Sequence, residues 1–119
     1  MLFAVNSKAE ENNIKYYSED SGILSLMYHR FDENKYPSTN IQMDIFKEQM
    51  SIINTLNYKF YDPQHLQKKF NITKSKKEIL ITIDDAFLSF YKFAWPYLKK
   101  EKIPFILFVS TEAVGKTGY

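Results

Sequence analysis

Short hydrophobic runs alternate along the chain with stretches of helical spacing. Runs of strand length occupy residues 22–28, 58–61, 79–83 and 105–109. After the first run, apolar residues recur every three or four positions, the period of one helical face: Phe46, Met50, Ile53 and Leu56. The pattern predicts an α/β fold whose parallel strands alternate with helices, either as an open sheet or rolled into a barrel.

Residues with special backbone preferences mark the ends of the predicted helices. Asn57 suits a left-handed stop to the first helix. Asp62 and Pro63 are typical of the cap and first turn of a brief second helix. Residues 87–102 have helical character, but Pro96 cannot donate a hydrogen bond inside a regular helix. We therefore expect a short helical turn first and a helix that restarts at Pro96.

Two adjacent carboxylates follow the run at residues 79–83. This run (ILITI) is apolar at nearly every position, as in a parallel strand covered on both faces, and Asp84 and Asp85 come directly after it. Reactive groups collect at the carboxyl ends of parallel strands. Adjacent acids there point in different directions, so one can bind a metal while the other moves a proton. In the alternative, one acid caps the next helix and the other is solvated.

Composition narrows the possible partners. The 119 residues fit a single domain, and a formal net charge of +2 gives no strong field for attracting nucleic acid. The chain has no cysteine, so Asp, Glu and His are the only plausible metal ligands. No apolar run approaches the roughly 20 residues that cross a bilayer, so we expect no membrane span.

The predicted domain, residues 22–119, follows a polar lead-in at residues 1–21. Met1 to Val5 are apolar, and Ser7 and Ala9 are small residues of the kind that a signal peptidase requires. The lead-in is therefore either the remnant of a signal peptide or a frayed terminus. We favour the periplasm, the cell envelope or secretion over the cytoplasm.

Two other protein classes share parts of this pattern. A phosphate-signalling receiver domain also uses paired acids at a strand end, but it needs a later aspartate, and none follows Asp85. Residues 110–117 (STEAVGKT) imitate a nucleotide-binding P-loop. A P-loop needs glycine where Ser110 stands and a helix after Thr117, so this class is kept as a second alternative.

Several motifs in a fixed order resemble the polysaccharide deacetylases, metal-dependent enzymes that remove acetyl groups from amino-sugar polymers. ITIDDAF resembles the T-F-D-D-G motif of that family, LMYHRF precedes it at the first strand, and PYLKKEKIPFILFV follows it. The likeness covers most of the chain from Gly22 onward. It implies about the first four strands of a deformed (β/α) barrel and an N-acetylated sugar polymer as substrate.

The resemblance also implies roles for individual residues. Asp84 would be the general base, taking a proton from water held by the metal, and Asp85 would be a ligand of that metal. The metal would be a divalent ion, zinc above all. Tyr28 and His29 would line the substrate site from the first strand, with a purely structural role as the alternative for His29.

The chain departs from the family pattern in two places that matter. Ala86 replaces the glycine of the motif. A Cβ would cost about 1 kcal/mol at a positive φ, so we expect either a negative φ at Ala86 or a slightly different turn. The family's later H-S/T-x-x-H motif, which supplies two further metal ligands, is absent from this sequence.

The exchange at Ala86 leaves the chemistry intact, whereas the missing histidine motif predicts an amino-terminal part of a larger deacetylase. Alone, we expect it to be inactive, to bind zinc weakly or not at all, and to have an open sheet edge through which it could self-associate. A non-catalytic carbohydrate-binding relative is the alternative.

Overall fold

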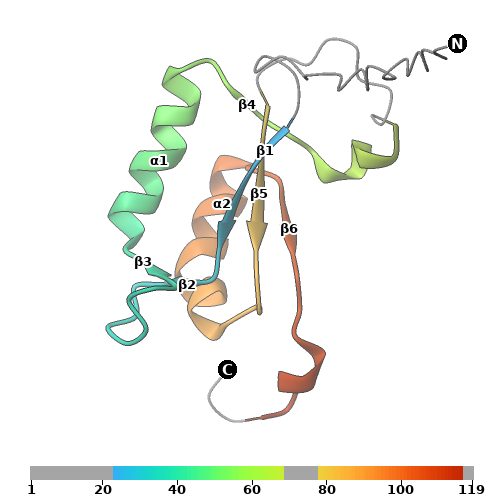
Figure 1. The fold of residues 1–119 in the computed structure, drawn as a ribbon. Coiled ribbons are helices and arrows are strands. Elements are labelled where there is room, and N and C mark those ends of the chain that lie inside the picture. The colour runs from blue at the N-terminus through green and yellow to red at the C-terminus, as the bar shows by residue number, and fades with distance from the viewer. Residues whose placement is uncertain (1–22, 69–77, 117–119) are drawn as a thin grey trace, which may run out of the picture.

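The computed structural model describes residues 23–68 and 78–116, so the predicted lead-in lies outside the described residues. The main sheet is parallel and consists of β1 (Ile23–Tyr28), β4 (Lys59–Phe60), β5 (Glu78–Ile83) and β6 (Phe105–Leu107). β5 is central, because β1 pairs with all six of its residues, β4 with its first two and β6 with its last three (Figure 1). The prediction of parallel strands alternating with helices is confirmed.

A second, very short sheet was not predicted. β2 (Arg30–Phe31) pairs in parallel with β3 (Asn40–Ile41). The intervening loop is closed by backbone hydrogen bonds from Arg30 to Thr39 and from Asp32 to Ile41, each 3.0 Å long. The chain that leaves β1 is therefore held in place by backbone pairing.

The first helix, α1 (Met43–Thr55), begins where the apolar period begins. Phe46, Met50 and Ile53 are buried as predicted, but Leu56 is 58% exposed, so its assignment to the buried face was wrong. Leu56 is the C-cap, where the chain has left the helical spiral, and Asn57 follows with φ +57° as its left-handed preference predicted.

The short helix before β5 is a 3₁₀ helix, η1 (Pro63–Lys68). The carboxylate of Asp62 accepts a hydrogen bond of 2.9 Å from the backbone N–H of Gln64, which confirms Asp62 as the cap.

The helical segment around Pro96 has the two predicted parts, a short helical turn and then a helix with Pro96 in its first turn, but the two are continuous. A π-helical turn, η2 (Phe90–Ala94), runs directly into α2 (Trp95–Glu101), with Pro96 in the first turn of α2. The backbone N–H of Trp95 donates to the carbonyl of Phe90, five residues earlier. The wider π-turn therefore accommodates the proline without interrupting the helical path.

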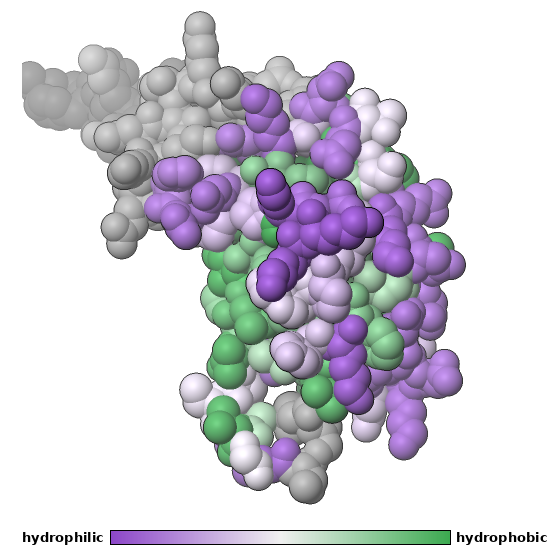
Figure 2. Space-filling view, turned by 180° about the vertical axis from the view of Figure 1, so that it is seen from behind, coloured by the Kyte–Doolittle hydropathy of each residue, from purple (hydrophilic) through white to green (hydrophobic). Residues whose placement is uncertain are grey.

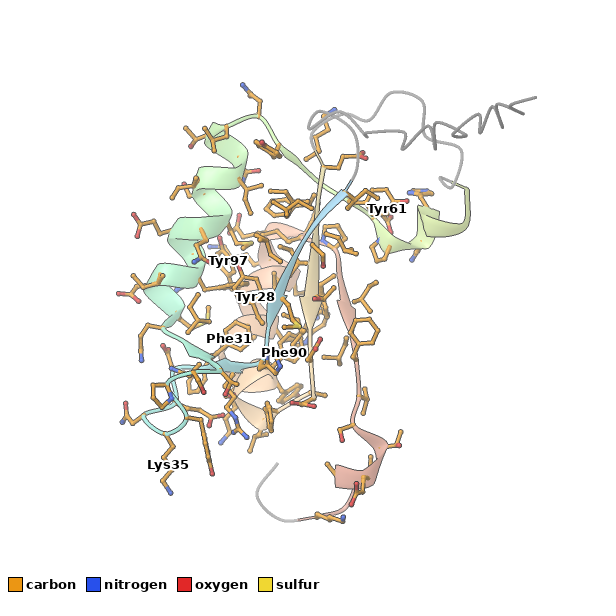
Figure 3. All side chains as sticks on the ribbon, viewed as in Figure 1. Tyr28, Phe31, Lys35, Tyr61, Phe90 and Tyr97 are labelled. Carbon is orange, nitrogen blue, oxygen red and sulfur yellow. The ribbon has the colours of Figure 1, made fainter. Side chains whose placement is uncertain are left out.

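One hydrophobic core joins α1, α2 and one face of the sheet. In Figure 3, Tyr28, Phe31, Phe90 and Tyr97 lie between the helices and the strands. Phe46 is fully buried there, with its ring in edge contact with Tyr28 at 4.9 Å between centroids. Leu80 and Thr82 face the opposite side of the sheet and are also nearly buried, so all residues from Ile79 to Ile83 are buried as the apolar run predicted.

β6 ends two residues earlier than the predicted run, and Phe108 and Val109 beyond it are each 53% exposed. Figure 2 shows hydrophobic surface along the side where β6 lies. The sheet does not close on itself within the described residues, so the barrel stays a prediction. No helix in the described part of the chain is long and apolar enough to span a membrane.

Candidate active site

The carboxylates lie where the sequence predicted, at the carboxyl end of β5. The backbone N–H of Asp84 donates to the carbonyl of Tyr28 at 2.8 Å, which continues the β1–β5 ladder one residue beyond the strand. Oδ1 of Asp84 is buried and has no hydrogen-bond partner among the described residues. A buried carboxylate oxygen with nothing to accept is suited to a proton, a cation or a substrate donor.

His29 is brought to the same place from the exit of β1. Its Nε2 lies 4.0 Å from Oδ2 of Asp84, and the two side chains are 23% and 29% exposed. This distance is longer than a hydrogen bond but allows electrostatic attraction when the imidazole is protonated. The structure thus joins His29 and Asp84 in one partly open site.

The next two residues have left-handed backbone conformations. Asp85 has φ +66° and Ala86 has φ +52°. The expectation of a negative φ at Ala86 is wrong, because its backbone takes the positive φ for which the related motif uses glycine. A β-carbon in this region costs about 1–2 kcal/mol, so the turn that carries the carboxylates is strained.

Asp85 opens onto a groove of about 260 Å³ between the turn after β5 and the segment after β6. Its walls are mainly apolar and include the exposed side chains of Leu88, Tyr91 and Val114. The hydroxyl-bearing Ser110 also lines it. A mixed apolar and hydroxyl lining of this kind is suited to a small organic group beside the carboxylate.

The Tyr28 side chain lies apart from the carboxylates. Its ring is packed between Phe31 and Phe46, and its hydroxyl donates to Oε1 of Gln49 at 2.7 Å. Burial raises the pKa of Tyr28 to about 12. The backbone carbonyl of Tyr28 contacts Asp84, whereas its hydroxyl points to α1, and a direct contact with substrate stays a prediction.

Sequence reasoning missed Arg30, which lies beside the same turn. Its guanidinium is stacked over the ring of Phe87 at 3.4 Å and also faces the ring of Tyr36 at 4.4 Å. It forms an ion pair of 2.8 Å with Glu33. The motif LMYHRF contained this arginine, but nothing in the sequence indicated which aromatic rings it would meet.

Glu33 connects this cluster to the segment after the carboxylates. Burial alone would raise the pKa of the Glu33 carboxyl, but hydrogen bonds from Ser89 and Arg30 and the charge of Arg30 outweigh burial and lower that pKa. Ser89 is itself buried and its Oγ accepts a hydrogen bond of 3.3 Å from the backbone N–H of Phe31.

The described residues could supply some of the ligands of a metal site, but not all of them. No cluster of three or more His, Asp or Glu side chains in the described ranges is arranged to hold a metal. The sequence has two histidines, His29 and His65, and His65 lies away from the carboxylates with its side chain 60% exposed. Asp85 can therefore supply one oxygen ligand, and further ligands would have to come from elsewhere.

The segment that imitates a P-loop forms a single 3₁₀ turn, η3 (Thr111–Ala113). Gly115 has φ +81° and the side chain of Lys116 forms an ion pair of 3.2 Å with Glu112. Thr117, after which a P-loop helix would start, lies outside the described residues.

Comparison with known proteins points to one class of enzyme. No protein-family model matches the chain. The poly-beta-1,6-N-acetyl-D-glucosamine N-deacetylase of Staphylococcus epidermidis is 26% identical over 130 aligned positions, which include 97% of this chain and 45% of that protein. The chain thus spans less than half of the length of this curated relative.

Two solved structures share the fold as well as the sequence likeness. IcaB from Ammonifex degensii is 34% identical with a TM-score of 0.70, over 79% of this chain and 40% of that one. The deacetylase PplD of Streptococcus pyogenes, solved with acetate, is 27% identical with a TM-score of 0.64, over 80% of this chain and 46% of that one. The resemblance first indicated by the motifs is confirmed: in sequence and in fold, this chain is similar to part of the polysaccharide deacetylases.

Proposed function

We propose that this chain provides the carboxylate half of a metal-dependent deacetylase site that acts on an N-acetylated amino-sugar polymer. The observation that carries the proposal is the Asp84–Asp85 pair at the exit of the buried strand β5, with a buried, unpartnered oxygen on Asp84 and His29 beside it. The similarity to one deacetylase named for poly-beta-1,6-N-acetyl-D-glucosamine supports this class of substrate.

The two acids have different roles in this proposal. Asp85, next to the groove, would be a metal ligand, and the bound ion, zinc above all, would polarise the acetyl carbonyl and acidify water. Asp84 would accept the proton of the attacking water, because its Oδ1 has a free acceptor site in a sheltered position. His29, 4.0 Å away, would orient the Asp84 carboxylate and face the substrate.

We further propose that the 119 residues alone bind zinc weakly and do not turn over substrate. Asp85 supplies one ligand, whereas a catalytic zinc site uses three protein ligands. The complete site would then require paired histidines from sequence beyond this stretch, within a deformed (β/α) barrel that covers the open side of β6. Where nothing covers the edge at β6, we propose that the chain self-associates through it.

The proposed substrate places the working protein in the periplasm, the cell envelope or the medium. The alternative is a carbohydrate-binding relative that has lost catalysis, and the two are distinguished by the encoding gene. An H-S/T-x-x-H pattern downstream of Tyr119 supports the enzyme, whereas an open reading frame that continues without it supports the binding protein.

The direct test is acetate release from N-acetylglucosamine oligomers linked β-1,6. The full gene product is assayed with added Zn²⁺ and Co²⁺, beside the variants Asp84→Asn and Asp85→Asn. We expect both variants to lose at least about a hundredfold of the activity, since a general base alone contributes on this scale. Undiminished activity in Asp84→Asn would overturn the assignment of the base, and full activity in both would overturn the site.

A further inference from the structure

The turn that carries the candidate acids needs support from its surroundings. Asp85 and Ala86 are consecutive residues with left-handed φ values of +66° and +52°, and neither is glycine. A strained pair of this kind persists only where neighbouring contacts fix the backbone. The contacts that fix it therefore also decide where the two carboxylates lie.

The turn is held at both ends by the chain that leaves β1. At its start, the N–H of Asp84 donates to the carbonyl of Tyr28 at 2.8 Å. At its end, Phe87 is buried beneath the guanidinium of Arg30, whose Cζ lies 3.4 Å from the ring centre. Two residues later, Ser89 accepts a hydrogen bond from the backbone of Phe31.

Arg30 is itself held in place. Its guanidinium is paired with Glu33 at 2.8 Å and faces the ring of Tyr36, and its side chain is only 15% exposed. Glu33 is fixed in turn, because its backbone N–H donates to Oδ1 of Asn40 at 2.8 Å. A planar guanidinium fits this aromatic contact, whereas a lysine ammonium cannot stack in the same way.

We propose that Arg30 is a positioning residue, which clamps Phe87 and thereby holds Asp85 and Ala86 in the left-handed turn that aims the candidate acids. The conformational part of this inference stands on the contacts above, and its catalytic meaning rests on the proposed deacetylase site. Arg30 acts through Phe87 and the turn rather than on substrate.

The test is NMR of the 119-residue chain, in which a strong amide-to-Hα cross-peak within one residue reports a positive φ. We expect strong peaks for Asp85 and Ala86 in the unaltered chain and clear weakening in both Arg30→Lys and Arg30→Met. Lys47→Met is the matched control, since Lys47 also lies over an aromatic ring, that of Tyr97 at 5.8 Å, but on α1. This control should leave both peaks unchanged.

Rescue distinguishes positioning from general destabilisation. Ala86→Gly in the Arg30→Lys background should restore the strong peak of Asp85, because glycine at position 86 adopts a positive φ without a steric cost. If Arg30→Met fails to fold, the cross-peaks of Arg30→Lys decide the test. Unchanged peaks in a folded Arg30→Lys chain would overturn the proposal, as would equal weakening in Lys47→Met.

A second readout tests the link to the acids. Mn²⁺, a hard cation that prefers oxygen ligands, is titrated while the broadening of amide signals near Asp85 is followed. We expect Arg30→Lys to weaken apparent affinity about threefold to tenfold, because affinity falls with the fraction of chains in the competent turn. If the unaltered chain shows no broadening there, the assignment of Asp85 as a ligand fails in this chain, while the cross-peak test of Arg30 still stands. Equal affinity with altered φ would overturn the positioning role.

Discussion

Replacing Ala86 by glycine should stabilise the protein, although glycine substitutions usually destabilise. At φ +52° the Ala86 β-carbon lies in the left-handed region, where it costs about 1–2 kcal/mol. Glycine removes this cost but gains about 0.4–1 kcal/mol of freedom in the unfolded chain. The difference is a net stabilisation of about 0.5–1 kcal/mol.

The free energy of unfolding is measured by urea titration and followed through the fluorescence of Trp95. This is the single tryptophan of the chain, and its ring packs edge-on against Phe105 at 5.7 Å. The matched control is Ala94→Gly, in the helical segment before α2, where the alanine is fully buried. That variant should lose about 1–2 kcal/mol through helix entropy and the lost methyl group.

The two substitutions make the same chemical change and should have opposite signs. A loss of stability in Ala86→Gly comparable to that in Ala94→Gly would show that Ala86 is not in a left-handed turn. The account of a strained carboxylate turn would then be wrong.

Three further outcomes follow from the packing and the charges. In urea titration, Phe46→Ala should lower the free energy of unfolding by about 3–5 kcal/mol. Ile52 lies on α1 and is 48% exposed, so Ile52→Ala should lower it by less than about 1 kcal/mol. Equal losses in the two variants would contradict the assigned buried face of the helix. The pKa of Tyr28 is raised from 10.0 to about 12, so the folded protein holds the hydroxyl proton more tightly than the unfolded chain. The contribution of Tyr28 to the free energy of unfolding is therefore fully present below pH 10 and should fall by about 2–3 kcal/mol as pH rises to 12. Tyr28→Phe should flatten that part of the stability profile, and an unaltered profile would refute the burial of the hydroxyl. Asp85→Asn should change stability by less than about 0.5 kcal/mol, because asparagine tolerates a positive φ, while Asp85→Ala should lose more.

The elements that the sequence predicted best are those with a strong period or a long apolar run. The run at residues 79–83 became the buried central strand, and the spacing of Phe46, Met50 and Ile53 became the buried face of α1. Both predictions rest on the spacing of apolar residues along the chain, which indicates the buried positions without knowledge of distant contacts. The position of Asp84 and Asp85 followed from the same strand.

The parts that were missed depend on contacts between distant segments. The β2–β3 pair has only two residues in each strand, too few for any periodic pattern. The contact between Phe31 and Ser89 joins residues 58 positions apart, and the stacking of Arg30 on Phe87 has the same origin. The continuous π-helical path into α2 was also missed, because a π-helical turn has no distinctive composition.

The most direct test of the divided roles of the two acids is Mn²⁺ broadening in the unaltered chain, Asp84→Asn and Asp85→Asn. If Asp85 is the ligand and Asp84 the base, amide signals of residues 84–86 should broaden first in the unaltered chain. Asp85→Asn should abolish this effect, and Asp84→Asn should largely retain it. Broadening centred on another part of the chain, or broadening that survives Asp85→Asn unchanged, would contradict the account.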